Sequence, residues 1–173
     1  MANTFTFISS VTVGAGGSST ITFSSIPSTY TDLQLVVSAR SSTGIYQTDC
    51  NVQVGNGSID TGSNYQTCEL YGDGTSVGSG SFTTTNIHPP IAGAGATGNT
   101  FGNFMLYFPN YLGSTKKSIS CDVVTENNSA NAAARLAAYL WTGTSAINII
   151  TLTAASGNFV QYSTAYLYGI RNS

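Results

Sequence analysis

Charged side chains are scarce in this sequence of 173 residues. Lys and Arg together number 5 and Asp and Glu together number 7, so 7% of the residues are charged, against about 25% in an average soluble domain. The five cations are scattered, with only Lys116 and Lys117 adjacent, and they cannot make the basic surface that neutralises phosphates. The sequence therefore predicts no nucleic-acid partner.

Long apolar runs are also missing. No stretch approaches the roughly 20 residues that span a bilayer, and the first ten residues, MANTFTFISS, have neither a basic start nor a long apolar segment. We therefore expect a soluble chain without a signal peptide and without a membrane partner. Aromatic residues make up 11% of the chain, which argues against disorder.

Cysteine and histidine are few. Cys50, Cys68 and Cys121 show no CxxC spacing, and the single histidine, His88, is distant from all three in sequence. We interpret the cysteines as free, buried thiols, with a bridge between two of them as the less favoured alternative. The pattern gives little support to a zinc site, and we predict no cofactor.

Small, uncharged polar residues are abundant instead. Ser (23), Thr (24), Asn (14) and Gly (19) make up nearly half of the chain, and they separate short apolar or alternating segments, which is typical of all-β proteins. We predict a single domain over residues 1–173 that folds as an antiparallel β-sandwich or barrel. The ten predicted strands are Phe5–Val13, Thr20–Phe23, Leu33–Arg40, Asn51–Val54, Tyr65–Tyr71, Phe101–Phe108, Ser118–Thr125, Arg135–Trp141, Ile147–Thr153 and Phe159–Ile170.

Two segments are harder to interpret. Residues 130–141 are rich in alanine, which favours a helix, but the asparagines before them and the Thr-Gly-Thr after them favour a strand. In the last predicted strand both faces are apolar, so we expect it to be central and covered on both sides. Gly14–Gly17 is predicted to be a hairpin turn.

Residues 72–100 form a long Gly/Ser/Pro-rich excursion. Loops of this length are usually functional, and we expect it to pack on a neighbouring subunit of an oligomer.

No catalytic pattern is evident. A triad needs a base beside a nucleophile, and the only candidate base, His88, directly precedes Pro89-Pro90. We interpret it as a loop side chain that packs locally. Asp32 and Asp73 have turn chemistry, and the ladder of ligands of a calcium loop is absent around Asp60 and Asp73. We predict that the protein is not an enzyme.

Exposed aromatic side chains would suit a carbohydrate. Sugar rings stack on such side chains, and Tyr111 and Trp141 are the candidate binding residues, with Tyr107 and Tyr46 as further ones. A glycan-binding module is therefore the alternative function.

Several motifs are spread along the chain, and the most specific are Ile26-Pro27-x-x-Tyr30-x-Asp32-Leu33 and the closing strand with Tyr166-Leu167-Tyr168-Gly169-Ile170. Weaker pieces complete the set. They are Phe7–Val13, Ile21–Ser25, Tyr71–Gly74, Phe108–Tyr111, Asn158-Phe159 and Gln161–Ser163. Together they resemble a pattern in virion structural proteins of tailed bacteriophages.

This resemblance implies a jelly-roll-like β-sandwich on a phage particle, either a head decoration (cement) protein or a tail- or fibre-associated protein. We expect the cement role, because the chain has no heptad or internal repeat typical of a fibre shaft. The implied partner is the major capsid protein, the implied location is the capsid surface of the virion, and the implied state is a homotrimer. The charge-poor surface fits this role, because apolar contacts are less sensitive to salt than exposed ion pairs are.

Overall fold

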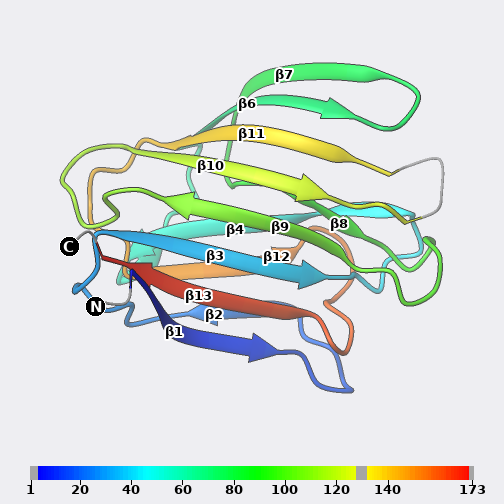
Figure 1. The fold of residues 1–173 in the computed structure, drawn as a ribbon, viewed down its shortest axis with the longest axis horizontal. Coiled ribbons are helices and arrows are strands. Elements are labelled where there is room, and N and C mark those ends of the chain that lie inside the picture. The colour runs from blue at the N-terminus through cyan, green and yellow to red at the C-terminus, as the bar shows by residue number, and fades with distance from the viewer. Residues whose placement is uncertain (1–3, 128–131, 172–173) are drawn as a thin grey trace.

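Two antiparallel β-sheets packed face to face make up the fold (Figure 1). The computed structural model describes residues 4–127 and 132–171, and these contain thirteen strands. Nowhere in these two ranges is there a helix long and apolar enough to cross a membrane. The fold confirms the predicted all-β sandwich, and the chain crosses repeatedly between the sheets, as in a jelly roll.

The larger sheet has eight strands in the order β1-β13-β3-β9-β10-β11-β6-β7, so β1 and β7 are its edges. All its neighbouring strands are antiparallel. Its strands are β1 (Phe5–Thr12), β3 (Asp32–Ala39), β6 (Tyr65–Gly72), β7 (Val77–Thr84), β9 (Gly102–Phe108), β10 (Lys117–Val124), β11 (Ala134–Trp141) and β13 (Thr164–Ile170).

The smaller sheet lies behind the larger one in Figure 1. Its order is β2-β12-β4-β5, and β8 pairs with another part of β4. Its strands are β2 (Thr20–Phe23), β4 (Gln47–Asn56), β5 (Ser58–Ile59), β8 (Pro90–Ala92) and β12 (Ile149–Ala154).

The two-residue period of the strands makes the core. In β10 the odd-numbered residues are buried and the even-numbered residues are exposed, because successive side chains of a strand point to opposite faces. The inward residues of both sheets form one hydrophobic cluster that includes Leu35, Leu106, Val52 and Leu152.

A strand is present at each of the ten predicted places, including the alanine-rich segment, which is β11 and not a helix. Residues 130 and 131 of that segment lie outside the described part of the chain. The bounds differ most for β4, which is longer than predicted, and for β13, which begins at Thr164 and not at Phe159. Three further strands, β5, β7 and β8, were not predicted.

The long excursion over residues 72–100 is therefore not a loop. It contains β7, which forms a hairpin with β6, and β8, which pairs with β4. The Asp73 carboxylate builds the hairpin turn as predicted, because its Oδ1 accepts the backbone N–H groups of Thr75 and Ser76 at 2.9 and 2.6 Å. Gly74 follows with φ of +89°, a conformation that favours glycine.

Two other expectations are corrected. Gly14–Gly17 does form a turn, with Gly17 N–H donating to Gly14 O, but it connects β1 and β2, which belong to different sheets. β13 is hydrogen-bonded on both sides, by β1 and β3, yet only one of its faces is covered, because Tyr166 is exposed on the other.

Two of the five cations are buried and hold loops. The Arg40 guanidinium donates to oxygens of residues 94–100, and the Lys117 ammonium donates to three backbone carbonyls. The carbonyl groups of these loops thus surround a buried cation. Because Arg40 and Lys117 are buried, fewer cations remain for the surface. The accepting carbonyls belong to Ala94, Ala96, Thr97 and Thr100 for Arg40, and to Gly113, Thr115 and Ser145 for Lys117.

Candidate functional site

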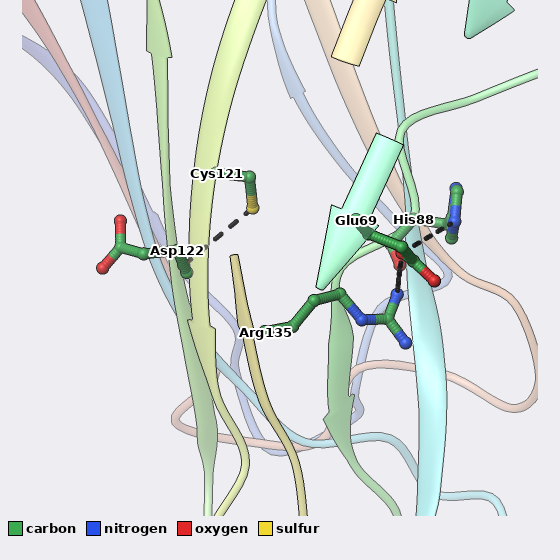
Figure 2. Close-up of polar contacts among 5 residues, drawn as sticks. All are labelled: Glu69, His88, Cys121, Asp122 and Arg135. Atoms are coloured by element: carbon green, nitrogen blue, oxygen red, sulfur yellow. Dashed lines mark hydrogen bonds and ion pairs between the residues drawn. The ribbon is translucent and has the colours of Figure 1, made fainter. Parts of the chain in front are cut away.

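The polarity of the larger sheet is inverted where β6 pairs with β11. Leu70 and Leu136 lie directly opposite each other in the register, and each exposes 62% of its surface to solvent. The preceding residue of each strand, Glu69 or Arg135, points into the protein (Figure 2). Proteins usually bury leucine and expose charged residues. The reverse arrangement at these neighbouring positions therefore marks this part of the sheet as a candidate site.

The exposed leucines belong to a longer row across the outer face of the sheet. The register places Leu70, Leu136, Asp122, Met105, Val36 and Tyr166 side by side on six neighbouring strands. Asp122 is the one charged residue in this row. The outer face is therefore a wide, nearly uncharged surface that no described part of the chain covers.

An apolar groove lies at the β7 end of this face. It has a volume of about 750 Å³, and its walls are the β6–β7 hairpin and the ends of β10 and β11. Val77, on β7, exposes 92% of its surface. We call this surface the apolar groove and define it by Leu70, Val77, Val124, Ala134 and Leu136.

Aromatic side chains gather at the opposite end of the same face. Phe7 lies opposite Tyr168 in the register of β1 and β13, and the two rings meet edge to face with centroids 6.0 Å apart. Phe5 and Phe7 each expose more than half of their surface, and Tyr166 is also exposed. We call this surface the aromatic ridge and define it by Phe5, Phe7, Tyr166 and Tyr168.

A charged cluster lies on the inner side of β6 and β11. Arg135 Nη1 is 3.2 Å from Glu69 Oε2, and His88 Nε2 is 3.8 Å from the same oxygen (Figure 2). The His88 ring packs between the rings of Phe82 and Tyr139, with centroids 5.2 and 5.4 Å away. His88 thus packs locally, as predicted, and its ring nitrogen contacts a carboxylate.

The cluster joins the β6–β7 hairpin to the smaller sheet. The segment that carries His88 runs beside β4, where Ile87 pairs with Val52 and Pro89 O accepts the Cys50 N–H. Burial raises the pKa of the nearby Asp49 carboxyl, and the charges of His88 and Arg135 partly offset this effect. The charges therefore hold the hairpin where the smaller sheet ends.

The structure buries both residues predicted to bind a carbohydrate. Tyr111 is 0% exposed and Trp141 is 3% exposed, so neither ring offers a face to a sugar, and their proposed role is corrected. Tyr111 OH donates to Pro27 O, and Trp141 Nε1–H donates to Asp60 Oδ2 at 2.8 Å.

The two further candidates differ from each other. Tyr107 is half-buried on the outer face and donates its hydroxyl to Asp32 at 2.8 Å. Tyr46 is exposed in the segment between β3 and β4.

The two most specific motifs meet Phe108–Tyr111 at one end of the sandwich, where Asp32 pairs with Ile170 and Leu33 with Phe108, and they have structural roles there. Asp32 accepts the Asn110 N–H at 2.7 Å, which holds a turn in which Asn110 has φ of +47°. The ring of Tyr30 lies so close to Gly169 that an added Cβ would be 2.3 Å from it. These motifs thus fix the fold, and Asp32 holds a turn as predicted.

The three thiols are free. Cys50 and Cys121 are buried as predicted, whereas Cys68 is exposed on the outer face, in the strand position before Glu69. Within residues 4–127 and 132–171, no three His, Cys, Asp or Glu side chains are grouped in a way that could hold a metal ion.

Sequence reasoning missed the apolar groove and the aromatic ridge. The signal that could have found them was present, because a strand that is apolar on both faces is either covered twice or exposed on one face. The expectation for β13 is the first arrangement, and the structure has the second.

Comparisons with known proteins identify no family. No protein-family model matches the chain, and no curated protein matches it. Among solved structures, a double mutant of congerin II is similar, with 14% identity over 77% of this chain and 98% of that chain and a TM-score of 0.24. A likeness at this level says nothing about what this chain binds.

Proposed function

We propose that the protein is a non-enzymatic structural protein of a tailed-bacteriophage particle, a capsid decoration (cement) protein that binds the major capsid protein and stabilises the head. In this role it acts on the capsid surface as a homotrimer. The phage assignment rests on the resemblance of its motifs, and the adhesive role rests on the outer face of the larger sheet.

One observation carries the adhesive role: Leu70 and Leu136 face solvent while Glu69 and Arg135 face inward. Shifting a strand by one residue exchanges its two faces, so a register that buried the leucines was available in principle. A sequence that keeps them outside, on a face with little charge, is best explained by a partner that covers them.

The inner cluster supports a role without catalysis. His88 Nε2 contacts the Glu69 carboxylate, which is not a nucleophile that the histidine could activate. Asp32 and Asp73 hold turns, and Asp60 accepts hydrogen bonds from Trp141 and Asn64. These groups therefore have structural roles.

The test is addition of purified protein to phage particles that lack it. We expect the wild-type protein to co-sediment with the particles and to raise the temperature at which they release DNA. Leu70→Asp/Leu136→Asp should abolish both effects, whereas Thr22→Asp, on the exposed face of the smaller sheet, should retain them. Localisation to the tail tip alone by cryo-electron microscopy would contradict the cement role.

A second candidate function is a receptor- or carbohydrate-binding module of the tail or fibre. The aromatic ridge favours it, because Phe7 and Tyr166 are exposed beside polar side chains of the same face. A glycan array tests this candidate. Saturable binding that is lost in Tyr166→Ala and kept in Tyr46→Ala would place this function above the cement role.

A further inference from the structure

The apolar groove and the aromatic ridge lie at opposite edges of one sheet. Six strands separate β1 from β7, and at the usual spacing of strands the two edges are roughly 34 Å apart. One molecule therefore cannot bury its own ridge in its own groove. Each surface needs a second molecule.

The two surfaces match each other, because one is a groove, the other carries exposed rings, and both are apolar. Half of the residues that line the groove are aliphatic, whereas the ridge presents the rings of Phe5 and Phe7, each more than half exposed. An exposed phenylalanine that enters an aliphatic pocket is a strong anchor for an interface.

The charges around the two surfaces are of opposite sign. Asp122 lies in the wall of the groove, and Arg135, which also lines it, is ion-paired with the buried Glu69. The adjoining hollow is lined by Asp73 and Glu126. At the end of the ridge the exposed cation is Arg171, whose backbone N–H donates to Thr4 O beside Phe5. Opposite charges at the rim of an interface favour one orientation of the partners.

We infer that copies of this chain associate head to tail, with the aromatic ridge of one copy in the apolar groove of the next. Such a contact uses two different surfaces of each subunit, so it closes into a ring if the rotation permits and otherwise makes an open chain. A three-membered ring is the homotrimer of the proposed function, on which this inference rests. The occupant of the groove is thus a second copy of the same chain.

Complementation between two defective variants is the decisive experiment. Leu136→Asp damages only the groove, and Phe7→Ser damages only the ridge. We expect each variant alone to be a monomer in sedimentation equilibrium, with self-association weakened roughly 30-fold or more. An equimolar mixture should form a dimer and nothing larger, because one intact groove and one intact ridge remain.

Three results would overturn the inference. They are a monomeric wild type, a mixture that stays monomeric, and a variant that associates as the wild type does. If like surfaces met around a two-fold axis, ridge on ridge or groove on groove, the mixture of the two variants would not recover association. Circular dichroism and thermal melting of both variants establish that they are folded, and Thr22→Asp is the matched surface control.

A charge exchange gives a second, milder test. Asp122→Arg and Arg171→Asp should each weaken association by roughly twofold to fivefold, and the double variant should recover it. Failure of the double variant to recover association, after loss in both single variants, would contradict the proposed orientation.

The exposed thiol offers a third test. Cys68 lies on the outer face of β6, two residues from Leu70, and Ser10 is exposed on the outer face of β1. A short bismaleimide should link Cys68 to Ser10→Cys of another copy, giving a covalent dimer or trimer. Thr22→Cys should give no such product, and equal linkage in both variants would contradict the contact.

These results are distinguishable from failure of the proposed function. Self-association is measured on the isolated protein, whereas the cement role is measured on particles. Head-to-tail association without binding to particles would remove the cement role and leave the contact. Binding to particles by a protein that stays monomeric would do the reverse.

Discussion

The two faces of the eight-stranded sheet are formed by the same strands, yet they are built to opposite rules. The inner face is sealed by the smaller sheet and holds an ion cluster where that sheet ends. The outer face carries leucine, valine and aromatic side chains in contact with solvent. Charges are buried and leucines are exposed at neighbouring positions of the same strands. We propose that the exposed leucines are there for assembly.

The largest expected effect on stability comes from the ion cluster of the inner face. Arg135→Met should lower the free energy of unfolding by about 3–5 kcal/mol, because it removes the guanidinium that pairs with the buried Glu69 carboxylate at 3.2 Å. Urea denaturation followed by circular dichroism measures this effect. Lys116→Met, at an exposed cation, is the control and should change stability by less than about 0.5 kcal/mol. Equal effects would contradict a structural role for the cluster.

The next largest effect separates two neighbouring residues of β3. Leu35 points into the core and Val36 points outward. Leu35→Ala should cost about 2–5 kcal/mol, because it leaves a cavity in the core, whereas Val36→Ala should cost less than about 1 kcal/mol. The same denaturation experiment decides, and a Val36→Ala variant as unstable as Leu35→Ala would show that the outer face is covered within the monomer.

A smaller effect is the dependence of stability on pH that arises from the hydrogen bond between Asp60 and Trp141, the last residue of β11. Burial alone raises the pKa of the Asp60 carboxyl, but hydrogen bonds from Trp141 and from two neighbours in the turn outweigh it and hold this pKa below its ordinary value of 3.8. The stabilisation is therefore present above about pH 4 and is lost as the pH falls through the pKa of the folded state.

Trp141 is the only tryptophan, so its fluorescence reports on this contact. We expect a change in its emission below about pH 4 that is absent in Asp60→Asn. An identical transition in both proteins would mean that another group is responsible.

The smallest effect leaves stability unchanged and compares two thiols of the same sheet. Cys68 faces outward on β6, whereas Cys121 faces inward on β10, where burial raises its pKa. Ellman's reagent should react at once with one thiol per folded chain and with three after denaturation. Cys68→Ser should remove the fast reaction, and a fast reaction that persists in this variant would contradict the assignment of the two faces.

The strands were predictable from the sequence because each carries its own local signal. Alternation marks Ile21 and Phe23 on β2, and apolar runs mark β3 and β9. β7 has no such signal, since its inward positions include Gly78 and Gly80, which pack against Tyr71 and Glu69 of the neighbouring strand. The turn at Asp73 was visible in the sequence, but the strand that follows the turn carries no apolar alternation that would mark it as the partner of β6.

The candidate site was not predictable for a related reason. Trp141 and Tyr111 were chosen because aromatic rings bind sugars, but a ring near the end of a strand or in the turn after one is exposed or buried according to what packs on it. The exposure of Leu70 and Leu136 has no local signal, because the sequence of a strand does not report which of its faces is covered. Only the sheet order and register decide that.

Sedimentation equilibrium of the wild-type protein tests the central claim most directly. If the outer face of the larger sheet is an assembly surface for copies of this chain, the mass at micromolar concentration is a multiple of 17.9 kDa, and Leu136→Asp reduces it to a single chain. A wild-type protein that remains at 17.9 kDa throughout the accessible concentration range would contradict the account.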